Sequence, residues 1–156
     1  MCICYRDIMF KKLFIPSDDS DLTNMALLVA RLWLGLTMLF NHGLEKLFHF
    51  GEFEQSIQDP LRLGSQATLI LVVLAEVAGS LLLAVGLLTR IAAAVLVIDM
   101  FVAFLMVNRT TLQGEGELAF LYLSGFVFLL IAGGGLFSLD TLVFKKSSFN
   151  QLPKNN

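Results

Sequence analysis

Charge is scarce in this sequence. Only 15% of its 156 residues are Asp, Glu, Lys or Arg, against 56% hydrophobic residues, and the net charge is −2. No basic patch interleaved with aromatic residues is present, which argues against a nucleic-acid partner. Cysteine is scarcer still: Cys2 and Cys4 both precede the first apolar run, so a disulfide framework within the apolar part is excluded. We interpret them as two reduced thiols, with metal binding or acylation as the alternative.

What the sequence has instead is long apolar runs. They cover residues 22–40, 67–88, 91–107 and 118–137. Each is close to the ~20 residues that a helix needs to span the hydrocarbon core of a bilayer. Three runs contain one ionisable residue each and the fourth contains none, whereas soluble helices carry a polar face. The sequence therefore predicts an all-α integral membrane protein, a four-transmembrane-helix bundle with the lipid bilayer as its surroundings.

Lys and Arg predict the orientation of this bundle. Seven of them lie before the first run, between the second and third, or after the fourth: Arg6, Lys11, Lys12, Arg90, Lys145, Lys146 and Lys154. The opposite side has Arg62, Arg109 and, near the end of the first helix, Lys46. The positive-inside rule then places the N- and C-termini in the cytoplasm and the chain in the cell inner (cytoplasmic) membrane as a multi-pass protein. The predicted domains are a leader at 1–21, a transmembrane domain at 22–140 and a cytoplasmic tail at 141–156.

Three ionisable residues are predicted to lie deep in the membrane. At 1.5 Å per residue, Arg31 and Asp99 are each about 13.5 Å from the cytoplasmic side, and Glu76 is about 18 Å from it. We expect one layer in which Arg31 bridges both carboxylates. One cation between two acids leaves one negative charge, so either a proton or a ligand completes the layer.

A second layer of polar residues is predicted toward the outer side. His42 and Lys46 lie near the end of the first helix, and Glu117 opens the fourth, so Lys46 could pair with Glu117 or Glu115. We treat Arg31, Glu76, Asp99, His42, Lys46 and Glu117 as candidates for ligand binding or a proton relay. A paired network that only fixes helix register remains the alternative. No catalytic residue and no metal site are predicted.

The connecting segments give weaker signals. Residues 49–66, with Phe48 just before them and Phe50 and Phe53 near their start, are typical of an interfacial segment; a plain connector is favoured over a lid across the bundle. Asp21 is expected to cap the first helix, with Ser20 as the alternative. The second and third helices are expected to form a hairpin with a very short turn at residues 88–90.

The order of short motifs resembles the DoxX-like family of bacterial and archaeal membrane proteins. The resemblance covers about residues 25–140. It rests on Arg31 with Gly35, the run His42 to Leu47, Pro60, Glu76-x-x-Gly79, Gly86-Leu87-x-Thr89-Arg90, and a closing Gly-x-Gly followed by Ser138-Leu139-Asp140. Ser80 stands where a second glycine is expected.

The resemblance implies an accessory role rather than catalysis. The family is named for a subunit of an archaeal thiosulfate:quinone oxidoreductase, and relatives accompany redox enzymes in membranes. The chain has neither Cys-x-x-Cys nor a bis-His haem pattern, so it is not expected to run redox chemistry alone. The first hypothesis is a subunit that binds a quinone or a partner oxidoreductase. The second is a small proton-coupled transporter, with a homo-oligomer open in either case, and a plain scaffold is the third.

Overall fold

The computed structural model describes residues 21–57, 59, 62–107 and 113–143, and this part of the chain is helical without any strand. Its first helical rod is continuous: α2 (Asp21–Met38) passes through the π-helical turn η1 (Leu39–Gly43) into α3 (Leu44–Phe48). Most of the predicted leader, with Cys2, Cys4 and Ser20, and most of the predicted tail lie outside the described residues. Asp21 is the first residue of α2.

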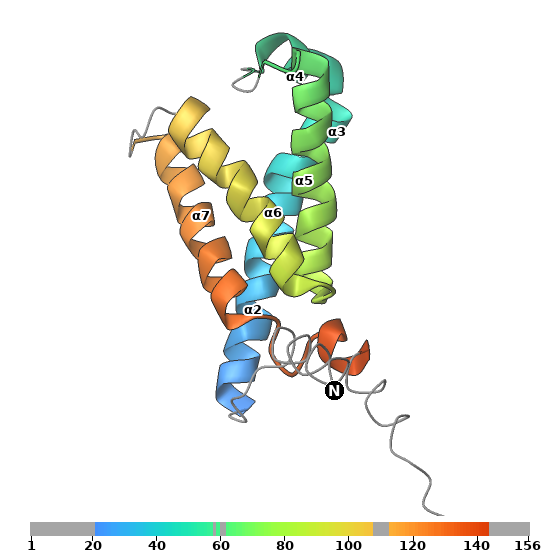
Figure 1. Cartoon of the computed structure of the whole chain (residues 1–156), viewed down its shortest axis with the longest axis vertical. Helices are drawn as coiled ribbons and strands as arrows, with labels where there is room; N and C mark the ends of the chain where they lie inside the picture. Colours follow the sequence, from blue (N-terminus) through green and yellow to red (C-terminus); the bar gives the residue numbers. More distant parts are fainter. Residues whose placement is uncertain (1–20, 58, 60–61, 108–112, 144–156) are drawn as a thin grey trace, which may run out of the picture.

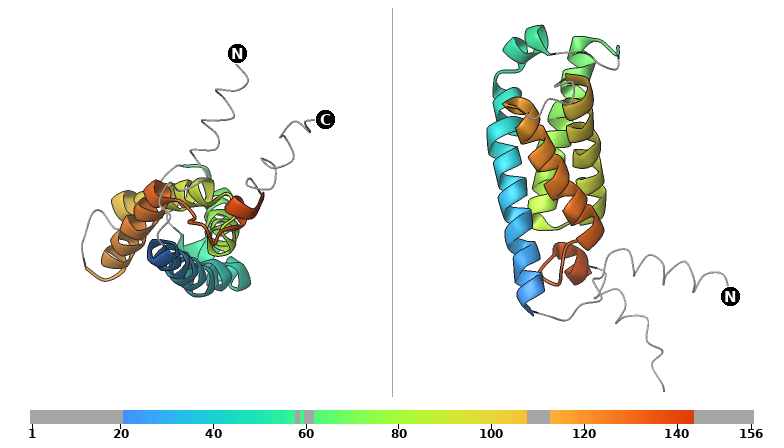
Figure 2. Two further views of the ribbon diagram at one scale, coloured as in Figure 1. Left: turned by 90° about the horizontal axis from the view of Figure 1, so that it is seen from below. Right: turned by 90° about the vertical axis from the view of Figure 1, so that its left-hand side faces the viewer.

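Three more helical rods complete the described bundle. They are α5 (Ser65–Val85), α6 (Thr89–Val102) with its π-helical continuation η2 (Ala103–Val107), and α7 (Glu115–Ala132). α2 packs on α5, α5 on α6 and α6 on α7, and α7 also contacts α2 (Figures 1 and 2). The hairpin between α5 and α6 is as tight as the sequence predicts. Gly86 ends α5 in the left-handed region at φ 75°, where a glycine carries no steric penalty.

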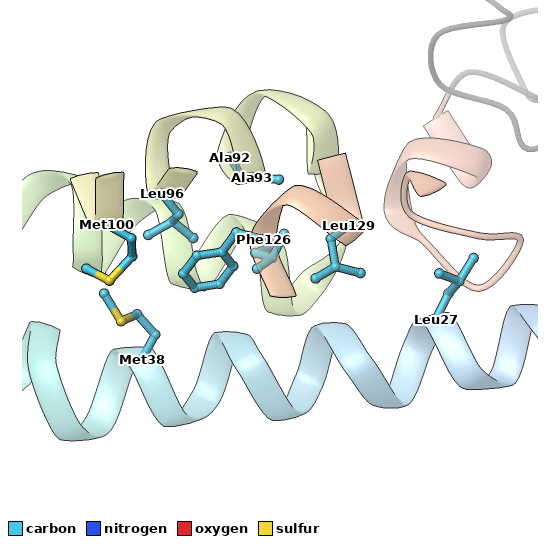
Figure 3. Close-up of a cluster of buried hydrophobic side chains, with 9 residues drawn as sticks. Leu27, Met38, Ala92, Ala93, Leu96, Met100, Phe126 and Leu129 are labelled. Atoms are coloured by element: carbon cyan, nitrogen blue, oxygen red, sulfur yellow. The ribbon is translucent and has the colours of Figure 1, made fainter. Parts of the chain in front are cut away.

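The interior of the bundle is filled with leucine, methionine, alanine and one phenylalanine. Figure 3 shows this core, in which Met38 of α2 meets Met100 of α6 and Phe126 lies between the helices. The core residues are Leu27, Met38, Leu83, Ala92, Ala93, Leu96, Met100, Phe126 and Leu129. Van der Waals packing of these side chains holds the helices together along most of their length.

The outer surface of the bundle is also apolar. Large side chains such as Trp33 and Ile131 are 71% and 72% exposed, which in water would be an aggregation hazard. By length and composition, Asp21–Phe48, Ser65–Val85 and Glu115–Ala132 are able to cross a membrane. The α-helical part of α6 has only 14 residues. A membrane crossing by α6, the third of the four predicted helices, therefore stays a prediction.

The two ends of the bundle are built differently. At one end, called here the α4 end, α4 (Phe50–Ser56) follows α3 after a break at His49. At the opposite end, residues 133–143 fold back across the bundle beside the start of α2, and residues 139–143 form a helical turn (Figures 1 and 2). α7 ends at Ala132, before the apolar run 118–137 does, because Gly133 adopts φ +81°. The sequence predicts that this helix finishes at Gly133–Gly135, and the structure confirms this.

Asp59 organises the entry into α5. Its carboxylate accepts hydrogen bonds from Leu63 N at 3.1 Å, Gly64 N at 2.7 Å and Thr68 Oγ1 at 2.8 Å. Desolvation raises the pKa of Asp59, but the hydrogen bonds to its ionised form outweigh it, so the pKa lies below its usual range. Part of the predicted interfacial segment is thus a specific helix-entry structure.

Candidate functional site

A buried ion pair joins the first helical rod to α5. Lys46 of α3 donates to Oε1 of Glu76, whose side chain is 1% exposed, whereas that of Lys46 is 20% exposed. The expected pairing of Lys46 with Glu115 or Glu117 is therefore wrong. Glu117 is exposed in the first turn of α7.

Asp99 of α6 belongs to the same site. Its carboxylate lies within the electrostatic influence of both Glu76 and Lys46. Asp99 Oδ2 and Glu76 Oε2 are buried and have no hydrogen-bond partner among the described residues. We call Lys46, Glu76 and Asp99 the acid–base cluster; it has one cation for two carboxylates.

Close backbone packing brings these three side chains together. A Cβ on Gly43 would lie 3.0 Å from Val77 Cγ2 and 3.3 Å from the carbonyl carbon of Glu76, so the missing side chain lets η1 lie close against α5. A Cβ on Gly79 would likewise lie 3.1 Å from Leu96 Cγ. This contact holds α5 against α6 one turn from Glu76 and Asp99. Glu76 and Asp99, two of the three residues expected in one layer, are therefore close enough to interact.

His42 lies beside the acid–base cluster, on the side of α7. Its ring meets the ring of Tyr122 edge-on, with centroids 5.4 Å apart and an interplanar angle of 88°. Tyr122 stacks in turn on Phe126 of the core at 5.9 Å. Lys46, Glu45 and Glu115 act electrostatically on His42, which is half-buried. In the described part of the chain no three His, Cys, Asp or Glu residues are placed to hold a metal ion.

Arg31 is not part of this cluster, and the expected Arg31–Glu76–Asp99 layer is wrong. Arg31 is fully buried at the opposite end of the bundle, where its Nη2 donates to the carbonyl oxygen of Phe137 at 3.0 Å. The acid that acts on it electrostatically is Asp140. Its Nε and Nη1 have no partner among the described residues. The guanidinium packs against Gly86, where any side chain would collide with it.

Asp140 ties the segment after α7 to the start of α6. Its Oδ1 accepts from Leu88 N at 2.6 Å and its Oδ2 from Thr89 N at 2.8 Å, while its own N–H donates to the carbonyl oxygen of Gly86 at 2.9 Å. The carboxylate therefore caps α6 from 51 residues away, where the helix dipole also favours a negative charge. Leu136 N donates to Asn24 Oδ1 at 2.8 Å.

We call this group of contacts the clasp. Its members are Asn24, Arg31, Gly86, Leu88, Thr89, Leu136, Phe137 and Asp140. It explains two of the sequence motifs physically, because the Gly86–Arg90 motif and the Ser138–Asp140 motif bind one another.

Sequence reasoning missed Tyr122 and the role of Asp140. Tyr122 is the only residue in the run 118–137 that combines an aromatic ring with a polar group, and this pattern could have indicated a site residue. The role of Asp140 had no signal in local sequence, since its partners are about fifty residues away.

An all-helical bundle with apolar outer surfaces, three candidate spans and buried charges defines a multi-pass membrane protein. The family profile named DoxX matches residues 26–109. An uncharacterized protein of Haemophilus influenzae (strain ATCC 51907 / DSM 11121 / KW20 / Rd) is 32% identical over 116 residues, covering 70% of this chain and 84% of that protein. No solved structure matches the chain. The chain belongs to the DoxX family.

Proposed function

We propose that this protein is an accessory subunit of a quinone-linked oxidoreductase in the inner membrane, and that the acid–base cluster holds and exchanges a proton there. The supporting observation is the cluster itself: a buried Lys46–Glu76 pair, with Asp99 close by and two carboxylate oxygens without partners. Ionisable residues inside a membrane bundle are functional candidates by default, because each is costly to insert.

The charge balance gives the cluster its chemistry. Lys46 neutralises one carboxylate and leaves one negative charge, whose insertion costs about 2.5–3.5 kcal/mol on biological scales. One proton, shared between Glu76 and Asp99, removes that cost. The cluster then releases the proton when a nearby reaction needs it and takes it back afterwards.

The donors of the cluster also fit a quinone. The Lys46 ammonium is a donor for a carbonyl oxygen, and the carboxylates of Glu76 and Asp99 are acceptors for a hydroxyl group. A bound quinone supplies two-electron chemistry coupled to protons. Lys46, Glu76 and Asp99 would orient its head group and hold or move the proton.

The test of this proposal is the retention of a quinone by the full-length protein. After gentle detergent extraction, native mass spectrometry should find a quinone on the wild type and on Glu117→Gln, and much less on Glu76→Gln. Glu117 is the matched control, since it is an exposed glutamate outside the cluster. A protein without quinone that takes up solute into proteoliposomes under a pH gradient would contradict the proposal and favour a proton-coupled carrier.

The proposed topology has four membrane-crossing helices and cytoplasmic termini, supported by the distribution of Lys and Arg. In a background with Cys2 and Cys4 replaced by serine, Gln113→Cys should react with an impermeant maleimide in intact cells. Ser148→Cys should react only after permeabilisation. Labelling of Ser148→Cys in intact cells would contradict this topology.

A further inference from the structure

The acid–base cluster is partly exposed through Lys46 toward the α4 end of the bundle, and Asp99 is half-buried. Glu76 is 1% exposed, but its partner Lys46 is 20% exposed, and Lys46 lies one helical turn after the half-buried His42. Glu45, next to Lys46 in α3, is exposed. Burial therefore decreases from Glu76 toward the α4 end of the bundle.

In the other direction the cluster meets a closed apolar layer. Leu83, Ala93, Leu96 and Phe126 are each 0% exposed and fill the bundle between the cluster and the clasp. The hydroxyl of Ser80, one turn from Glu76, already donates to the carbonyl oxygen of Glu76. No helix contributes a titratable side chain to this layer.

The layer is too thick for a proton to pass without carriers. Ten residues separate Glu76 from Gly86, a rise of about 15 Å along α5. Beyond it lies the clasp, where Arg31 is fully buried and Asp140 is 1% exposed. Burial of both groups closes this end of the bundle to water.

From these observations we infer that the acid–base cluster exchanges its proton with the α4 end only, past Lys46, and that the clasp end is closed to protons. This deepens the proposed function and rests on it. The charged and titratable groups facing the path are Lys46 and Glu45 of α3, His42 of η1, Glu76 of α5, Asp99 of α6, and Tyr122 and Glu115 of α7. In this state the protein loads a proton from one side and does not conduct it across the membrane.

The test uses an apolar carbodiimide, which enters the membrane and reacts with protonated carboxyl groups. The carboxyl O–H adds across one C=N bond of the reagent, and rearrangement gives a stable N-acylurea. Right-side-out and inverted membrane vesicles containing the full-length protein are compared, with the lumen buffered and the pH of the bath lowered. With Cys2 and Cys4 replaced by serine, a Ser56→Cys reporter labelled with an impermeant maleimide identifies the preparation whose α4 end faces the bath.

When the α4 end faces the bath, adduct formation at Glu76 and Asp99, mapped by peptide mass spectrometry, should rise by up to about tenfold per pH unit. When the clasp end faces the bath, it should not change. Glu76→Gln removes its own adduct, and Glu117→Gln leaves both adducts unchanged. A response from the clasp end, or equal responses from both, overturns the one-sided access and leaves the proposed function standing. Absence of adducts at every pH overturns both, because the cluster then holds no proton.

Discussion

Replacing Asp140 tests the clasp most directly. Asp140→Ala leaves Leu88 N and Thr89 N, which it meets at 2.6 and 2.8 Å, without an acceptor. Loss of a helix cap costs about 0.5–2 kcal/mol, and each buried donor left unsatisfied costs about 1–3 kcal/mol. These figures describe the same bonds, so we expect a total loss of about 2–4 kcal/mol. Asp140→Asn keeps one acceptor oxygen and should lose roughly half of that.

The assay is unfolding by SDS in mixed micelles, followed by far-ultraviolet circular dichroism. Glu117→Gln is the control; as an exposed acid in the first turn of α7 it should lose no more than about 1 kcal/mol. If Asp140→Ala were as stable as this control, the capping role of Asp140 would be refuted.

Double mutants test which carboxylate interacts with Arg31. Arg31→Leu combined with Asp140→Asn should be more stable than the sum of the single effects by about 0.5–3 kcal/mol, as for residues in one network. Combining Arg31→Leu with Glu76→Gln should be additive within about 0.5 kcal/mol, because those sites are distant. Rescue of Arg31→Leu by Glu76→Gln would mean that the two residues face each other after all.

Three further outcomes follow from the packing. Lys46→Met should lose about 3–5 kcal/mol by leaving Glu76 buried and unpaired, and adding Glu76→Gln should recover much of it in the same unfolding assay. Gly35→Ala should lose about 1–3 kcal/mol, since its Cβ would lie 2.9 Å from a backbone oxygen, whereas Gly51→Ala, with open space around it, should not destabilise. Because the folded-state pKa of Asp59 is lowered, its stabilisation is present above the unfolded pKa of about 3.9 and is lost as the pH falls through the lower folded value. The protection factors for hydrogen exchange in the first turn of α5, taken relative to the intrinsic exchange rate at each pH, should therefore fall in acid, and Asp59→Asn should remove this dependence.

The helical runs and the similar depth of Glu76 and Asp99 could be predicted from the sequence. The apolar runs indicate the helices, and counting residues from the very short turn between α5 and α6 places Glu76 and Asp99 within about 5 Å of the same depth. Nothing beyond regular helix geometry was needed for this part of the candidate site.

The partner of Lys46 could not be predicted from a regular helix. A regular α-helix turns by about 100° per residue, but the π-helical turn η1 lies between Arg31 and Lys46. A π-helical turn holds more residues than an α-helical one, so every side chain after it is rotated relative to those before it. Lys46 consequently reaches Glu76 of α5 and not the first turn of α7.

The partner of Arg31 was hidden for a different reason. Counting residues along a helix predicts the depth of a side chain in the membrane, but not which segment lies beside it. The sequence after α7 looks like the start of a tail, and nothing in it indicates that the chain folds back onto the bundle. Its contacts with α2 depend on the backbone at Gly133 and Gly135, at φ +81° and +73°. Glycine adopts positive and negative φ about equally readily, so its presence in the sequence does not predict which backbone conformation it takes.

The clasp also sets an order of events during biogenesis. Its bonds from Arg31 to Phe137 and from Leu136 to Asn24 join residues 106 and 112 positions apart in the chain. α2 must therefore enter the membrane with Arg31 uncompensated and wait until α5, α6 and α7 have been synthesised and residues 133–143 have left the ribosome. During that interval the guanidinium of Arg31 has no partner, a feature that membrane proteases and chaperones can recognise. A chain truncated after α7 keeps all its long helices but never closes, and it should be degraded as an unfinished product.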